Sequence, residues 1–247
     1  MRHIFVYMSV LLLSFVLAAC DDVEVFTGGD GVRGSGTIVT ETREVTGFNQ
    51  ITLAGEGAVI LTEGQDPSLT IETDDNLMVH IQTSVTGDVL RIATESGIDI
   101  DPTDSVVYRV SAPTITGLTL SGAGSLQLSE SGAEEMAVLL SGAGDIRIGS
   151  LSAAELVVEI SGAGAVTIAG QTGLQTVKIP GAGSYEGAEL ASSSATVTTS
   201  GVGSATVWVT DQLVATVTGV GSIDYYGTPA VTQAVSGVGT INSRGDK

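Results

Sequence analysis

Carboxylates are the most numerous groups in the sequence that could do chemistry, with 28 acidic against 9 basic residues in the 247-residue chain. Two carboxylates at the right separation can cleave a glycosidic bond, one as acid and the other as base or nucleophile. The acids that stand in pairs or short clusters include Asp74, Asp75, Asp99, Asp101, Asp104, Glu134 and Glu135. They do not recur at a constant spacing, so a carbohydrate-active enzyme is the alternative hypothesis and not the first.

A histidine base and a metal ion are the other sources of catalysis. His80 is the only histidine beyond the first 20 residues, and its setting between Val79 and Ile81 predicts an outward residue on an apolar strand. The segment Asp99–Asp104 offers oxygen ligands for calcium but lacks the glycine and the terminal glutamate of an EF-hand loop. We therefore predict solvated loop acids, no metal, no cofactor and no enzyme activity.

Cys20 is the only cysteine, and it points to a different chemistry. Arg2 and His3 give a short basic start before the apolar run Ile4–Leu17, a pattern typical of a secretory signal. The ending Leu-Ala-Ala-Cys resembles the bacterial lipobox, whose cysteine becomes the lipidated first residue after cleavage. We predict a lipoprotein signal peptide over residues 1–20 and membrane attachment through a lipid on Cys20. A lone cysteine also excludes an internal disulfide and a multi-cysteine zinc site.

The charge of the chain limits its partners. Cleavage before Cys20 would remove Arg2 and no acid, leaving 9 − 1 = 8 basic and 28 acidic residues, a net charge near −20. Such a surface does not suit nucleic acid, which needs clustered lysine and arginine, and anionic head groups repel it. Residues 21–36 are rich in glycine and acids and are predicted to form a flexible tether from membrane to domain.

A repeated glycine phrase indicates which secondary-structure elements would position a functional site. A five-residue phrase containing Gly-x-Gly begins at Ser121, Ser141, Ser161, Pro180, Ser200, Thr218 and Ser236, so successive copies lie 18 to 20 residues apart. We predict turn or packing roles for its glycines, which are Gly122, Gly124, Gly142, Gly144, Gly162, Gly164, Gly181, Gly183, Gly201, Gly203, Gly219, Gly221, Gly237 and Gly239. This period lies at the short end of solenoid repeats, in which each coil contacts only its neighbours.

Apolar residues alternate with polar ones on both sides of the phrase. Leu118 and Leu120 precede the first copy, and Leu126 and Leu128 follow it. Alternation with period 2 predicts strands, and a strand with one buried face is covered by its equivalent in the next coil. The sequence therefore predicts an all-β parallel β-solenoid with coils of about 18–20 residues. The phrase is either a tight corner with positive φ at glycine, or a straight strand that the opposite wall approaches closely.

Residues 118–247 form the regular part of this prediction, and residues 37–117 form a more irregular N-terminal part. A degenerate phrase at Ala54–Gly57 indicates that the solenoid starts well before Leu118. Strands are predicted within a cap, because terminal units of a solenoid differ from inner ones. These strands cover Leu69–Ile71, Met78–Ile81, Val89–Ile92 and Val106–Val110.

Threonines on the last coils suggest a minor alternative function. The pairs Thr196/Thr198 and Thr216/Thr218 resemble the T-x-T pattern of β-helical ice-binding proteins, and Thr206 and Thr210 stand nearby. High strand propensity explains threonine more simply. Ice binding would need a regular array.

Aromatic residues gather near the C-terminal end of the sequence, where Trp208, Tyr225 and Tyr226 stand close together. Aromatic rings can stack on sugars. We predict that these rings instead cap the open end of the core, because an uncovered end would invite end-to-end association.

Three stretches carry a family resemblance: GSGTIVTETREVTGFNQITLAGEGAVILTEG from Gly34, DDNLMVHIQTSVTGDVLRI from Asp74, and the L-S-G-A-G phrases. Together they resemble the bacterial DUF2807 family, the head GIN domain of autotransporter adhesins. The matching landmarks are Arg43, Phe48, Ile51, Gly55, Val59, Gly64 and the Asp75–Leu77 triplet. The resemblance covers roughly residues 34–245 and implies a right-handed parallel β-helix exported by Gram-negative bacteria. It implies no catalytic residue.

These observations predict a non-catalytic, lipid-anchored envelope protein that binds through a repetitive face by many weak contacts. A straight phrase would make that face a ladder of small residues, starting with Ser121, Ala123 and Ser125. The expected partner is a polysaccharide or a protein of the envelope or host surface, and exposed solenoid ends predict self-association. The expected location is the periplasmic face of either membrane, or the cell surface.

Overall fold

The computed structural model describes residues 31–247, and within them the chain is built from β-strands apart from one short 3-10 turn. The predicted signal peptide, Cys20 and most of the predicted tether lie outside the described residues. In the described part, no helix is long and apolar enough to cross a membrane.

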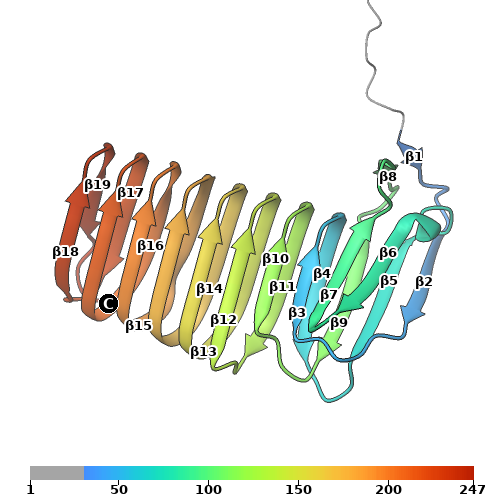
Figure 1. Ribbon diagram of the computed structural model, residues 1–247, viewed down its shortest axis with the longest axis horizontal. Coiled ribbons are helices and arrows are strands. Elements are labelled where there is room, and N and C mark those ends of the chain that lie inside the picture. Colours follow the sequence, from blue (N-terminus) through green and yellow to red (C-terminus); the bar gives the residue numbers. More distant parts are fainter. Residues whose placement is uncertain (1–30) are drawn as a thin grey trace, which may run out of the picture. The chain divides into compact units, whose positions relative to one another are not determined.

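The regular part is a parallel β-solenoid, as the residue spacing predicts (Figure 1). Each strand pairs in parallel with the equivalent strand of the next coil, so that Leu126 aligns with Ile146 and Ile146 with Val166. From β13 on, one strand follows most of a coil through its bends. The strands of this part are β10 Gly117–Leu120, β11 Ala123–Ser131, β12 Glu135–Leu140, β13 Ala143–Ile160, β14 Ala163–Ile179, β15 Ala182–Thr199, β16 Val202–Val217, β17 Val220–Tyr226, β18 Ala230–Val235 and β19 Val238–Ser243.

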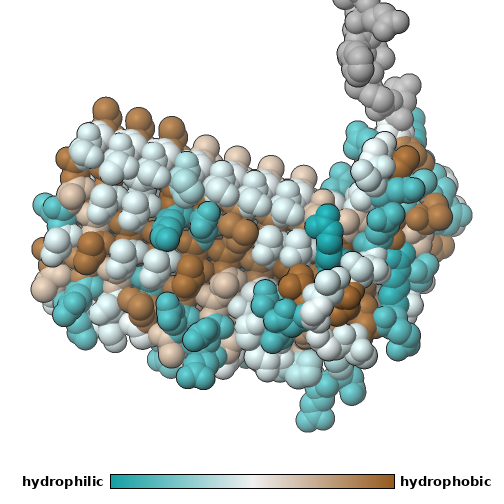
Figure 2. All heavy atoms as spheres, viewed as in Figure 1, coloured by the Kyte–Doolittle hydropathy of each residue, from teal (hydrophilic) through white to brown (hydrophobic). Residues whose placement is uncertain are grey.

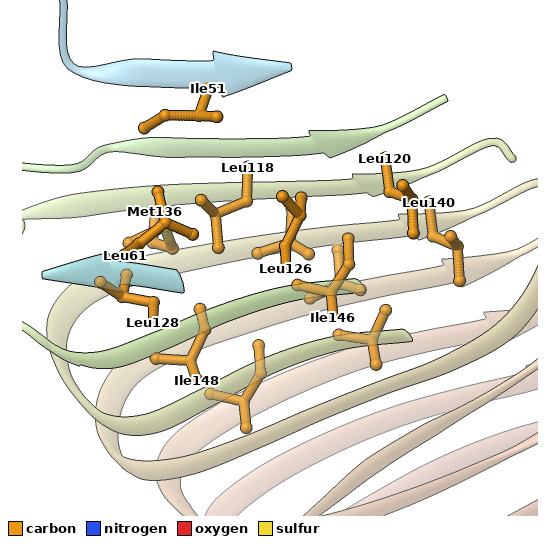
Figure 3. Packing of buried hydrophobic residues seen from close by; sticks show 14 of the residues in the cluster. Ile51, Leu61, Leu118, Leu120, Leu126, Leu128, Met136, Leu140, Ile146 and Ile148 are labelled. Carbon is orange, nitrogen blue, oxygen red and sulfur yellow. The ribbon is translucent and has the colours of Figure 1, made fainter. Parts of the chain in front are cut away.

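Period-2 alternation places one set of side chains inside the coils. Leu126 and Ile146 are fully buried, and Figure 3 shows them side by side on neighbouring coils, with Leu128 and Ile148 in the adjacent row. Burial of apolar area stabilises by roughly 25 cal/mol per Å². Because these rows run between coils, each inner coil depends on its two neighbours for its stability.

The glycine phrase is a bend between two walls of the coil. Its first two residues interrupt the strands, and the N–H groups of Ser141 and Gly142 both donate to Leu120 O, each at 2.9 Å. A methyl group on Gly142 would collide with Gly122 O of the preceding coil. The close approach therefore comes from the neighbouring coil and not from the opposite wall. Positive φ, from 134° to 145°, adds to this constraint at Gly124, Gly144 and Gly164.

The first coil consists of β3 (Gln50–Leu53) and β4 (Glu56–Glu63), and its spatial neighbour is distant in sequence. β3 pairs with β10 and β4 with β11, which aligns Gly57 with Gly124. Figure 1 shows β4 beside β11 for this reason. The degenerate phrase is stacked directly on the first regular copy, which confirms that the solenoid starts before residue 118.

Residues 64–116 leave the stack between these two coils and build the N-terminal cap. β7 (Val89–Thr94) and β9 (Val107–Ala112) pair in parallel with β3 and β4 on the side away from the regular coils. β6 (Ile81–Thr86) then pairs antiparallel with β7, β5 (Ser68–Asp74) antiparallel with β9, and β2 (Ile38–Arg43) antiparallel with β5. The change from parallel to antiparallel pairing ends the stack.

One strand prediction within the cap was wrong. Met78–His80 form the 3-10 turn η1, and strand β6 begins only at Ile81. Arg43 donates from Nη1 to Ile81 O at 2.7 Å and from Nη2 to Met78 O at 3.3 Å. The guanidinium thus satisfies backbone carbonyls at the turn, and buried carbonyls need such partners.

Residues 31–36 are ordered against the cap, which corrects the expectation of a flexible tether as far as residue 36. β1 (Val32–Arg33) pairs in parallel with β8 (Ile100–Asp101). The buried carboxylate of Asp74 accepts a hydrogen bond of 2.7 Å from the N–H of Gly36. A buried charge needs such donors, so this glycine-rich segment has a specific place in the fold.

A polar network interrupts the apolar rows in the middle coils. Gln175 is fully buried in register with Leu156 of the preceding coil. Its Oε1 accepts from the hydroxyl of Tyr185 at 3.0 Å, and its Nε2 donates to Ser192 Oγ at 2.6 Å. These bonds tie β14 to β15, because removing one partner would leave a buried polar group unsatisfied.

Substitution of Gly142 by alanine tests the close approach at the corners. Gly142 is outside the positive-φ region, so the added methyl acts only through its collision with Gly122 O. We expect a loss of about 1–3 kcal/mol in the free energy of unfolding, as for other overpacked sites, measured by urea denaturation with circular dichroism. The control Ala143→Val alters the next, exposed residue and should change stability by about 0.5 kcal/mol or less. Equal stability of Gly142→Ala and wild type would show that the corner can widen freely.

Candidate functional site

The glycine corners lie one above another along one edge of the solenoid, and their outward side chains form a continuous surface. We name it the corner strip. Figure 2 shows it along the edge of the coils, where the first and third residue of every phrase are exposed. It comprises the first, third and fifth residues of the phrases: Ser121, Ala123, Ser125, Ser141, Ala143, Asp145, Ser161, Ala163, Ala165, Pro180, Ala182, Ser184, Ser200, Val202, Ser204, Thr218, Val220, Ser222, Ser236, Val238 and Thr240.

The corner strip is regular because the phrases pair residue by residue. Ala123 aligns with Ala143, and at the other end Val220 aligns with Val238. Neighbours in a parallel ladder lie about 4.8 Å apart. A ligand that runs along the strip therefore meets the same kind of group at each coil, an arrangement suited to many weak contacts.

The strip is almost uncharged and becomes more apolar toward its C-terminal end. The third phrase residue is alanine in the first four copies and valine in the last three, where Val202, Val220 and Val238 are 62%, 51% and 75% exposed. Asp145 is its one charged residue, and its Oδ1 accepts a hydrogen bond from Ala165 N at 3.1 Å. This neutral surface stands on a chain with a net charge of −19.

Glu56 continues the alanine row at the N-terminal end of the strip, where it pairs with Ala123. Its Oε1 is buried and has no hydrogen-bond partner among the described residues. Burial raises the pKa of Glu56, and the nearby carboxylates of Asp99 and Asp101 raise it further. The ionised carboxylate is therefore a destabilising group at this position.

A groove of about 510 Å³ lies at the other bend of the coils and gathers three glutamates. Glu135 and Glu155 are direct neighbours on adjacent strands, and Glu134 lies beside them in the lining. Neighbouring Cα atoms in such a ladder are about 4.8 Å apart, so both carboxylates belong to the same part of the groove, and a glycosidase also uses two carboxylates. The described residues that line the groove include no histidine, lysine or arginine.

The other predicted acids serve the cap. The carbonyl oxygens of Asp99 and Asp101 accept the N–H groups of Val32 and Gly34 at 2.7 and 2.8 Å. Asp104 lies in the loop after them. Within residues 31–247, no three side chains of the metal-binding types are grouped closely enough to hold an ion.

His80 stands at the end of η1, and not on a strand. Its Nδ1 lies 2.9 Å from Oε2 of Glu95, and the imidazole is half-buried. A catalytic triad consists of a carboxylate, the imidazole that it orients, and a nucleophile. His80 and Glu95 correspond to the first two of these groups. This pair alone supplies no covalent catalysis.

The threonines of the last coils do not form a regular array. Thr196 and Thr198 face outward on β15, and Thr198 aligns with Thr216. Thr196, however, aligns with Val214, and Thr218 belongs to the corner strip. The geometry does not favour ice binding.

The aromatic residues divide between the core and the surface. Tyr225 packs against the end of the hydrophobic core, in keeping with a capping role. Trp208 and Tyr226 are neighbours on β16 and β17, and Nζ of Lys247 lies 5.3 Å from the centroid of each ring. The same ammonium lies 2.6 Å from Oε1 of Glu189. The side chain of Lys247 therefore already contacts both rings.

The fold and the corner strip together define the chain as a β-solenoid repeat protein with a repetitive exposed surface. The sequence profile described as "Putative auto-transporter adhesin, head GIN domain" matches residues 47–229, and the chain belongs to this family, DUF2807. The family is adhesin-like, which places the chain among secreted or cell-envelope proteins.

Several solved structures have similar folds. A structure described as a "putative adhesin" from Bacteroides fragilis is 26% identical with a TM-score of 0.83, covering 86% of this chain and 100% of that one. A "putative adhesin" from Parabacteroides merdae is 23% identical with a TM-score of 0.65, covering 87% and 99%. A "putative lipid binding protein" from Parabacteroides distasonis is 20% identical with a TM-score of 0.69, covering 86% and 98%. The last two show the fold alone. No curated protein matches the chain.

Sequence reasoning missed Glu155, Glu56 and Lys247 as parts of these sites. Glu155 follows Glu135 by 20 residues, one coil length, and this spacing was visible in the sequence. The contacts of Glu56 and Lys247 depend on the cap and on the returning C-terminal segment. No local pattern reports those contacts.

Substitution of Glu56 by glutamine tests the buried charge. Because the pKa of Glu56 is raised in the fold, wild type loses stability as pH rises through that pKa. We expect Glu56→Gln to melt at a higher temperature than wild type at pH 7, with the difference disappearing below about pH 4, as the carboxyl becomes protonated in both the folded and the unfolded chain. The control Glu134→Gln removes an exposed carboxylate, which separates the loss of a buried charge from a change in net charge. A gain that persists unchanged at low pH would contradict the charge argument.

Proposed function

We propose that the chain is a non-catalytic, adhesin-like protein of the cell envelope that binds a polymer or a partner protein along the corner strip. The observation that carries this proposal is the aligned row of exposed, nearly uncharged side chains over all the glycine corners. It is supported by membership of an adhesin-like family.

The shape of the strip favours a long ligand that lies across the coils. A series of corners at about 4.8 Å spacing offers small, equal contact points, and their sum gives avidity without any single strong site. The acidic remainder of the surface repels polyanions. A neutral polysaccharide or an uncharged peptide segment fits best, with Val202, Val220 and Val238 making the largest apolar contacts.

The anchor in this proposal is a lipid on Cys20. The described chain begins beside the cap, where β1 docks, whereas the valine end of the corner strip belongs to the last coils.

A carbohydrate-active enzyme is the second candidate, and one observation favours it. Glu135 and Glu155 are direct neighbours on adjacent strands, and both line the groove. The groove offers no cationic or imidazole group among its described lining residues. The two candidates use different surfaces, so one assay separates them.

Removal of the three exposed valines tests the binding proposal. The full chain and the variant Val202→Ser/Val220→Ser/Val238→Ser are applied to an array of bacterial envelope and host polysaccharides, and each well is assayed for released oligosaccharide. We expect binding without release, weakened about tenfold or more in the variant because apolar contact area is lost. The control is Val79→Ser, since Val79 in the cap is 75% exposed, like Val238.

Two outcomes of this array experiment would contradict the proposal. Equal binding by the triple variant and wild type would show that the corner strip does not take part in binding. Release of oligosaccharide that stops in Glu135→Gln or Glu155→Gln would establish the enzyme instead.

Substitution of Cys20 by alanine tests the anchor. Expressed with radiolabelled palmitate in a Gram-negative host, the wild-type chain is expected to incorporate label and to sediment with membranes. Cys20→Ala should incorporate none, because the chain has no other cysteine. Equal labelling of the two chains, or label in neither, would refute lipidation at this residue.

A further inference from the structure

The last coil leaves one side of its strands without a partner in the described part of the chain. β18 pairs with β16, and β19 pairs with β17, on the side of the preceding coil. All six residues of β18 are exposed, and Figure 1 shows both strands at the end of the stack. Edge strands of this kind present free backbone donors and acceptors to another chain.

The hydrophobic core is also open at this end. Val231 and Val235 occupy the same inward rows as Leu213 and Val217 of the preceding coil. Leu213 and Val217 are 1% and 0% exposed, whereas Val231 and Val235 are 36% and 47% exposed. The inward residues of the last coil therefore lack the cover that a further coil would provide.

The open end carries no charge. From Tyr225 to Ser243 the sequence has no acidic or basic residue. Natural edge strands are usually protected by charged side chains, and the edge strand β2 of the cap has Glu41 and Arg43. On a chain with net charge −19, two copies repel each other over most of their surface, and this end avoids that repulsion.

The C-terminal segment does not cover the opening. Arg244 N donates to Tyr225 O at 2.8 Å and Gly227 N donates to Gly245 O at 2.9 Å, which directs the chain back along the preceding coil. Arg244 is paired with Asp224, whose Oδ2 lies 2.8 Å from Nη2. The charges next to the open end are thus neutralised within the chain.

We propose that the open end binds a second copy of this chain about a two-fold axis. In this arrangement β18 pairs antiparallel with β18 of the second copy, and β19 likewise with β19, so both walls continue across the interface. A two-fold contact uses the same surface on both copies and closes at a dimer. A head-to-tail contact would instead join this end to the charged, antiparallel cap and would not close.

The sequence of β18 fits this symmetry. Gln233 faces inward in the row of Ala215 and is exposed. When the antiparallel pairing is centred on Gln233, Val231 faces Val235 of the second copy and the two Gln233 amides meet on the axis. An amide has both donor and acceptor, so two of them can hydrogen-bond reciprocally and satisfy each other between the valine pairs.

The dimer goes beyond the proposed function and does not depend on it. A chain that fails to dimerise can still bind along its corner strip, and a chain that dimerises need not. The two proposals are therefore tested separately.

Opposite charges at Gln233 test the dimer and its axis. The full chain, purified in a mild detergent, is analysed by sedimentation velocity from roughly 1 to 100 µM, a range that resolves micromolar dissociation constants. We expect wild type to form dimers, and Gln233→Lys and Gln233→Glu each to weaken dimerisation by about tenfold or more, because like charges meet on the axis. An equimolar mixture of the two variants should restore the dimer.

Controls separate this contact from other causes of association. Gln233 is exposed in a single chain, so neither variant should lower the melting temperature appreciably. Ser200→Lys adds the same charge at an exposed corner two coils away and should dimerise like wild type. Residues 1–30 are identical in all variants, so association through them would not respond to Gln233.

Three results would overturn the proposal. One is a wild-type chain that stays monomeric over the whole range. Another is a Gln233→Lys variant that associates like wild type. The last is a mixture of the lysine and glutamate variants that stays monomeric, which would exclude the two-fold pairing centred on Gln233.

Discussion

The contact between stacked glycine corners is the constraint on which the rest of the structure depends. The carbonyl oxygen of Gly142 occupies the space where Gly162 of the next coil would carry a Cβ atom. Only a residue without a side chain fits there, so each phrase must align with the one before it. That alignment sets the register of both walls, stacks the inward leucines, isoleucines and valines into buried rows, and exposes the serines, alanines and valines of the corner strip. The candidate binding surface is thus a direct consequence of the interaction that orders the core.

The features of the fold that repeat could be predicted from the sequence, and those that occur once could not. Period-2 alternation around Leu126 and Ile146 correctly indicated parallel strands, because every copy carries the same signal. The degenerate phrase in front of β4 indicated that this strand belongs to the solenoid, but no local pattern reported that residues 64–116 leave the stack and that β4 pairs directly with β11. The same holds for Gln175, whose burial depends on a hydroxyl from the next coil. For the candidate site, the ladder of small residues could be anticipated, whereas the choice between corner and straight strand required the stacking geometry.

The two ends of the solenoid differ in how they meet water. At the cap, antiparallel strands replace parallel ones, and polar groups such as Asp74 and Arg43 hold the turns in place. At the other end the same inward rows simply stop, with Val231 and Val235 uncovered. The acidic residues are distributed so that the corner strip and this end remain almost neutral. Repulsion between acidic surfaces then discourages most contacts and leaves these two areas available for specific ones.

The placement of the cap has a consequence for how proteins of this design change over time. Residues 64–116 close the stack on one side of the first coil, and every later coil is added on the other side by pairing with its predecessor. Duplication or loss of one 18- to 20-residue unit would therefore alter neither the cap nor the rule by which coils join. Each such event would move the far end by about 4.8 Å. The length of the stack is therefore determined by the number of repeats that the sequence encodes.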